Sequence, residues 1–443
     1  MSIPRVRVDV PVRGTFNLRH FSTSALLVLG SAFVANAFFY VFHFILSRKL
    51  GPELYGTLAT LMAIVGIFGV LGSSVGTVAM QETARMWSAH LDEHIPHFLR
   101  QTGKLVLGLA ALLVVLLLSL SIPLGAYIHV VNIVLWITLA MWVGLALLCG
   151  YARGAAQGAH RFWVFACSMV SEGVLRVVLA ATFVTAGFAI EGALGGLVCA
   201  VFVGLLIAVV PMLSGRRHEA SKEPDHLRLG GDALKVLAVN VAASALLFID
   251  MLFAKHYFSG VQAGYFGAAG TVAKTIPYGV GLIALITMPT AAAARHTNRE
   301  SLKHILRVAG IFAVSAISLA LLIIALFSPQ LIGITYGPHY SGAIPIMRLY
   351  AIDEALLAMW IVASSYLVAI AQYRLVWYLF AAVVIEAACM ALFGLTPTRL
   401  LSIAIAVNAL LVPAMWILAL GSLRDAPQAA NPPRAEAFNE SPL

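Results

Sequence analysis

The chain has 443 residues, of which 61% are hydrophobic and 11% are charged, and its formal net charge is +9. Soluble domains carry roughly 25% charged residues, so this composition excludes an ordinary water-exposed globular protein. The surplus apolar surface must face lipid. Because a helix satisfies its own backbone hydrogen bonds inside a bilayer, the sequence predicts an all-α, polytopic membrane protein.

Apolar segments long enough to cross a membrane recur along the whole chain. A helix needs about 20 apolar residues to span the hydrocarbon core. About twelve spans are predicted, at residues 24–47, 57–80, 105–127, 131–150, 163–188, 192–213, 235–257, 265–291, 308–327, 349–370, 375–396 and 400–421.

Polar stretches divide these spans into two groups. The longest internal one, residues 214–234, predicts a linker between an N-terminal six-helix lobe (24–213) and a C-terminal six-helix lobe (235–421). The turns at 47–56 and 254–264 are similar, each with a basic residue and glycines, which favours pseudo-symmetric parallel repeats over chance similarity. The remaining polar segments are an N-terminal segment, 1–23, and a tail predicted to be disordered, 422–443.

The positive charges predict an orientation. Most of the 28 Lys and Arg residues fall on the side of the N-terminus when the predicted spans are threaded through a membrane. Such an excess marks the cytoplasmic face, so both termini and the linker are predicted to be cytoplasmic. The net charge then reflects topology, and no nucleic-acid partner is expected. The four cysteines lie in apolar spans without metal-ligand spacing, so neither a metal nor a cofactor is expected.

Predicted spans five, eight and eleven carry ionisable residues near mid-membrane, where each costs about 2.5–3.5 kcal/mol to insert. Glu172 and Arg176 are four residues apart on one helix face, so they are either an intrahelical ion pair or part of a polar cavity. Lys274 has no acidic neighbour on its own helix. It is either a cavity cation or a buried partner of Asp250 in span seven.

Acidic residues and glycines in other spans give further predictions. Glu386 in span eleven is either a proton site or an interhelical hydrogen-bonding group, whereas Asp353 and Glu354 are expected near the outer surface, in contact with solvent. Glycines around Pro277 predict that span eight is kinked or broken, and glycines in span two predict close helix packing. No motif of catalytic chemistry is present, so the chain is not expected to be an enzyme.

Several short motifs resemble those of one transporter family. They are the stretch 47–56 (SRKLGPELYG), Arg153–Gly158 before span five, Glu172–Arg176, Asp250 in span seven and Lys274–Pro277 in span eight. Together they resemble the polysaccharide-transporter flippases of the multidrug/oligosaccharidyl-lipid/polysaccharide exporter superfamily. The paired Asn-x-Asp that is frequent at the position of Asp250 is absent here.

The resemblance implies a V-shaped pair of lobes with alternating access. Such proteins flip undecaprenyl-diphosphate-linked saccharides, as O-antigen or exopolysaccharide units, to the outer leaflet of the bacterial plasma membrane. The implied substrate-binding cations are Arg176, Lys274, Arg48 and Lys49, the last two near the outer exit. The implied acids for H+ or Na+ coupling are Glu172, Asp250 and Glu386.

The implied partners are the lipid-linked oligosaccharide, membrane lipid, glycosyltransferases and a glycan polymerase. Two alternatives stay open. The first is a drug or metabolite cation antiporter of the same superfamily. The second, a surface-glycan polymerase or ligase, is disfavoured because the outer loops are short.

Overall fold

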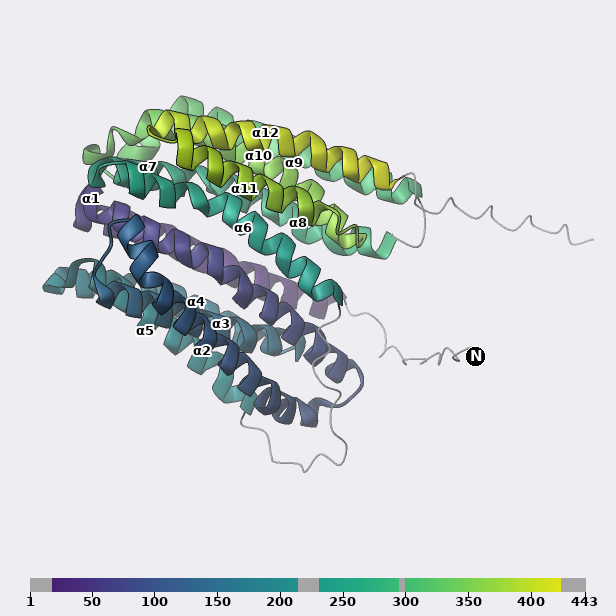
Figure 1. Cartoon of the computed structure of the whole chain (residues 1–443). Coiled ribbons are helices and arrows are strands. Elements are labelled where there is room, and N and C mark those ends of the chain that lie inside the picture. The colour runs from purple at the N-terminus through teal and green to yellow at the C-terminus, as the bar shows by residue number, and fades with distance from the viewer. Residues whose placement is uncertain (1–17, 214–230, 295–298, 424–443) are drawn as a thin grey trace, which may run out of the picture.

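The computed structural model describes residues 18–213, 231–294 and 299–423, and every regular element within them is a helix (Figure 1). The predicted all-α class is therefore confirmed. The predicted linker and C-terminal tail lie almost entirely outside the described residues, as does most of the N-terminal segment, and they stay predictions.

The N-terminal half contains two long bent helical stretches. The helices are α1 (Leu18–Ser88), α2 (Ile95–Tyr127), α3 (Ile133–Gly158), α4 (Phe162–Phe183) and α5 (Ala189–Leu213), with a short 3₁₀ turn at Asp92–His94. Predicted spans one and two form the single element α1, which bends where Gly51 takes a φ of 72° before Pro52. A π-helical turn, Val184–Phe188, joins α4 to α5.

The C-terminal half contains a broken helix at its centre. The helices are α6 (Gly231–Tyr257), α7 (Gly260–Ala273), α8 (Thr275–Ala294), α9 (Arg299–Thr335), α10 (Ala343–Ala369), α11 (Leu375–Phe393) and α12 (Pro397–Ser422), with a 3₁₀ turn at Pro338–Tyr340. Predicted span eight is interrupted between α7 and α8, and the residue at the break is Lys274.

Nine helical stretches of the described residues are long and apolar enough to cross a membrane, which makes the chain a multi-pass membrane protein. Two of them, Leu27–Ser88 and Phe162–Leu213, are 62 and 52 residues long and each contains two predicted spans. The broken pair α7–α8 is outside this set. The exact count of twelve spans stays a prediction.

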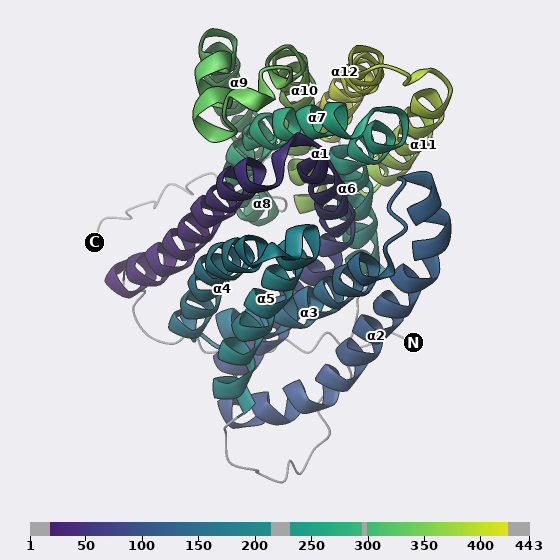
Figure 2. The ribbon, with the colours of Figure 1, turned by 90° about the vertical axis from the view of Figure 1, so that its left-hand side faces the viewer.

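The helices form two groups that meet along α1 (Figures 1 and 2). In the first group α1, α3, α4 and α5 pack on one another, and in the second α10 contacts α7, α8, α9 and α12. Helix α1 also packs against α6 and α7, so its two arms form much of the contact between the halves.

Glycines allow α1 and α3 to approach backbone to backbone, as predicted for span two. Gly72 and Gly76 of α1 lie against Gly150 and Gly154 of α3, and a Cβ atom at Gly154 would overlap the Gly76 carbonyl. We expect Gly154→Leu to push these helices apart and to destabilise the protein by about 1–3 kcal/mol or more. Thermal unfolding of the detergent-purified protein measures this effect. Gly108→Leu on α2 is the matched control, because a side chain there meets open space; equal melting temperatures for the two variants would contradict the packing argument.

Candidate transport cavity

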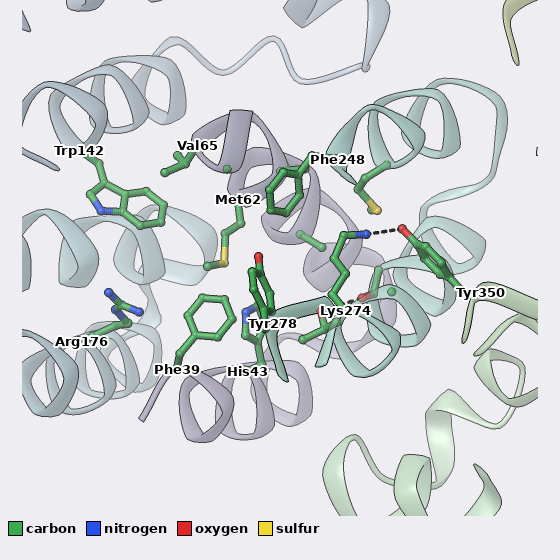
Figure 3. A pocket seen from close by; sticks show the side chains of 17 residues that line it. Phe39, His43, Met62, Val65, Trp142, Arg176, Phe248, Lys274, Tyr278 and Tyr350 are labelled. Carbon is green, nitrogen blue, oxygen red and sulfur yellow. Dashed lines mark hydrogen bonds between the residues drawn. The ribbon is translucent and has the colours of Figure 1, made fainter. Parts of the chain in front are cut away.

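A cavity of about 230 Å³ lies between the two groups of helices. Its walls come from α1, α3 and α4 on one side and from α6, α7, α8 and α10 on the other. Arg176 and Lys274 both line it, together with aromatic side chains that include Phe39, Trp142 and Tyr278 (Figure 3). The structure therefore brings together the two cations that the sequence singled out, from opposite halves of the chain.

Lys274 is held by three polar side chains of the C-terminal half. Its Nζ lies 3.1 Å from Oε1 of Glu354 and 3.9 Å from Oδ2 of Asp250, and it donates to the Tyr350 hydroxyl at 2.5 Å. Tyr350 in turn donates to Asp250. Only 8% of Lys274 is exposed. Lys274 thus lines the cavity and also pairs with Asp250, and Glu354 is the nearer acid.

Arg176 belongs to an ion-paired trio in the N-terminal half. It donates to Oε1 of Glu172 at 2.5 Å, while Arg153 of α3 approaches Oε2 of the same carboxylate at 2.7 Å. Arg153 also donates to the side-chain and backbone oxygens of Ser168. Two guanidinium groups share one carboxylate, so the three residues together carry one net positive charge. Of the three, Arg176 is the residue that lines the cavity.

The acids of α10 differ from expectation. Asp353 and Glu354 are buried, not solvent-exposed, because α10 begins at Ala343, which places Asp353 about 15 Å along the helix. Asp353 accepts a hydrogen bond from Asn408 at 2.8 Å. Glu386 on α11 is fully buried, and neither of its carboxyl oxygens has a hydrogen-bond partner among the described residues.

Arg48 and Lys49 lie at the bend of α1, on the protein surface and away from the cavity lining. Arg48 donates to the backbone carbonyl of Ile334 at 2.6 Å and lies over the Phe44 ring. Arg48 therefore makes a contact between the two halves of the chain.

Four residues of this region were not among the predicted site residues. Arg153 was expected in a loop, but α3 continues through it. Predicted span ten starts at residue 349, which places Glu354 near the outer surface, whereas α10 begins at Ala343 and Glu354 is buried. His43 lies in predicted span one, and its place in an apolar segment is the same signal that identifies the other ionisable residues. Tyr350 offered no sequence signal, because its role depends on a contact with α6 and the α7–α8 break.

Comparisons with known proteins agree with this architecture. The model of a family described as polysaccharide biosynthesis protein matches residues 23–292. No curated protein matches the chain by sequence.

Solved structures share the fold at low sequence identity. An inward-facing multidrug resistance MATE family transporter of the MOP superfamily is similar with a TM-score of 0.71 and 16% identity, covering 87% of this chain and 95% of that one. An outward-facing MATE transporter gives a TM-score of 0.62 and 17% identity over 91% and 96%. The lipid II flippase MurJ, in an inward closed conformation, gives 0.64 and 13% identity over 90% and 87%.

Proposed function

Because the chain belongs to the polysaccharide biosynthesis protein family, we propose that it is an alternating-access transporter that flips undecaprenyl-diphosphate-linked saccharides. The direction is from the inner to the outer leaflet of the bacterial plasma membrane, and the cargo is an O-antigen or exopolysaccharide unit. The supporting observation is the cavity between the two halves, lined by Arg176 and Lys274. Cations in a cavity with low-dielectric walls attract a diphosphate strongly, while the lipid tail stays in the bilayer.

The acids near Lys274 support a role in ion coupling. Oδ1 of Asp250, Oε2 of Glu354 and both carboxyl oxygens of Glu386 have no hydrogen-bond partner among the described residues. Glu354 is the acid that pairs most closely with Lys274, at 3.1 Å, so we assign H+ or Na+ coupling to Asp250 and Glu386. Glu172 is ion-paired by Arg153 and Arg176, and we assign it the task of holding Arg176 at the cavity. Glycosyltransferases and a glycan polymerase would supply and consume the cargo.

A drug or metabolite cation antiporter is the second candidate, favoured by the buried acids Asp250, Asp353, Glu354 and Glu386 near a single lysine. Transport assays in proteoliposomes separate the two. We expect a fluorescent short-chain polyprenyl-diphosphate saccharide to cross the bilayer and ethidium, an amphipathic cation, to be excluded. Transport of ethidium without transport of the diphosphate would overturn the flippase proposal.

We also propose that both termini and the 214–234 linker are cytoplasmic. In a variant without the four native cysteines, single cysteines at Glu53 and His339 should react with a membrane-impermeant thiol reagent added to intact cells. A cysteine at Ser221 should react only after the cells are permeabilised. The reverse pattern would invert the proposed orientation.

A further inference from the structure

The indole N–H of Trp142 is a buried donor without an acceptor. Trp142 lies on α3, lines the cavity and is only 7% exposed. A buried tryptophan usually finds a hydrogen-bond partner for its N–H. The fully buried Trp136 and Trp360 have one, because they donate to the Val130 carbonyl and to Oδ1 of Asn408, both at 2.8 Å. Nε1 of Trp142, in contrast, donates to no acceptor among the described residues.

The free nitrogen is open toward the inside of the protein. Nε1 of Trp142 is not one of the unpartnered polar atoms that neighbouring side chains cover completely. The outward side of α3 is marked by Ile137 and Met141, which are 44% and 49% exposed, whereas Leu135 and Leu139 are buried like Trp142. The space that Trp142 borders is therefore the cavity, and a molecule bound there can supply the missing acceptor.

The other neutral polar groups that line the cavity offer no equivalent donor. Thr271 and Tyr350 already donate their hydroxyl protons within the protein. One nitrogen of His43 lies 2.7 Å from a tyrosine hydroxyl, and the other is covered completely. Tyr278 is 49% exposed, so its hydroxyl can be satisfied from outside the cavity as well. Among the described residues, Trp142 is thus the buried neutral donor on the cavity wall that lacks a partner.

The surroundings of this donor favour a sugar over a phosphate. In the view of Figure 3, Trp142 and Arg176 lie at one end of the cavity and Lys274 at the other, with Met62 and Val65 between them. Phosphate oxygens carry charge and are best matched by the two cations. A sugar has neutral oxygens at its rim and C–H groups on its faces, so it can accept from the indole N–H and also cover the apolar wall. Because the first sugar is bonded to the diphosphate, it lies close to Arg176 when that residue holds a phosphate.

We propose that Trp142 is a specificity-determining residue of the transporter: its Nε1–H donates to an oxygen of the sugar attached to the lipid diphosphate. This inference rests on the proposed flippase function. Arg176 and Lys274 attract the charge that every lipid diphosphate carries, so they do not distinguish a glycosylated lipid from a bare one. Trp142 does, because a bare lipid diphosphate leaves its N–H unpaired. The chain then favours the loaded carrier lipid over the same lipid without cargo.

Two tryptophan-to-phenylalanine substitutions on α3 form a matched pair. Trp142→Phe removes the N–H that faces the cavity, keeps an aromatic ring and breaks no hydrogen bond within the protein. Trp136→Phe removes an N–H that donates to the Val130 carbonyl, away from the cavity lining. The melting temperature should therefore fall further in Trp136→Phe, which leaves a buried carbonyl unpaired. Arg176→Ala is the third variant, since it weakens the hold on the phosphates whatever they carry.

The experiment measures the affinity of the detergent-purified protein for two probes. They are farnesyl diphosphate and the same lipid diphosphate carrying one N-acetylglucosamine, which offers hydroxyl and carbonyl acceptors. We expect the unsubstituted protein to bind the glycosylated probe about threefold to tenfold more tightly, as expected for one neutral hydrogen bond. In Trp142→Phe the ratio of the two affinities should fall to about one, whereas Trp136→Phe should keep it. Arg176→Ala should bind both probes more weakly by a similar factor.

The outcomes separate this inference from the function on which it rests. If the unsubstituted protein binds neither probe, the proposed function fails, and the inference fails with it. Equal binding of the two probes, or a Trp142→Phe variant that keeps the preference for the glycosylated one, overturns the role of Trp142 and leaves the flippase proposal standing. A Trp142→Phe variant that binds both probes more weakly by the same factor shows that the N–H serves a phosphate, which also overturns its role in specificity.

Discussion

Lys274→Ala should abolish export of lipid-linked saccharide. The substitution removes the ammonium group that faces the cavity and leaves the carboxylates of Glu354 and Asp250 beside it. Those acids would repel a diphosphate where the lysine attracted it. Breaking a buried ion pair also costs about 3–5 kcal/mol, so we expect the amount of folded protein to fall as well. Surface glycan, normalised to membrane protein level in a host that lacks its own copy, measures the loss.

A second substitution separates the loss of function from the loss of stability. Lys274→Ala combined with Glu354→Gln removes the nearest uncompensated charge, so protein level should recover while export remains absent. Lys274→Arg should retain part of the export, because a positive charge is preserved within reach of the same acids. Normal export by the double variant would remove Lys274 from the substrate site.

Much of the architecture could be predicted because it depends on local sequence. Each predicted span falls mostly on helix, and the glycines and Pro277 in span eight predict the break that the structure has at Lys274. The family resemblance is confirmed by the match over residues 23–292. Hydropathy and helix-breaking residues act within one segment, so they can be read without knowing which helices are neighbours.

The partners of the charged residues could not be predicted, because they depend on which helices meet. Lys274 has no acid within one helical turn, and its partners come from α6 and α10, 24 to 80 residues away along the chain. Hydropathy ends predicted span four at residue 150, which leaves Arg153 outside the site, whereas α3 extends to Gly158. A few residues of error at a helix end are enough to move a buried ion pair into a loop.

Arg176→Ala should reduce export about tenfold to a hundredfold without loss of folded protein. A hydrogen bond to a charged group contributes about 1.5–3 kcal/mol, which corresponds to that range. Glu172 would not be left as an unpaired buried charge, because Arg153 still lies 2.7 Å from its other oxygen. The stability of the N-terminal half should therefore be preserved while the cavity loses one of its two cations.

Arg153→Ala is the matched comparison, because both arginines pair with Glu172 and of the two Arg176 lines the cavity. Arg153 joins α3 to Ser168 of α4, so its loss should lower the melting temperature of the purified protein. Export per folded molecule should then fall less than in Arg176→Ala. The two variants should differ because the Glu172 carboxylate pairs with both arginines, while Arg153 joins helices and Arg176 lines the cavity. If Arg176→Ala exported normally, or if both variants lost only stability, the trio would be a structural tie between helices and the cationic wall of the cavity would rest on Lys274 alone.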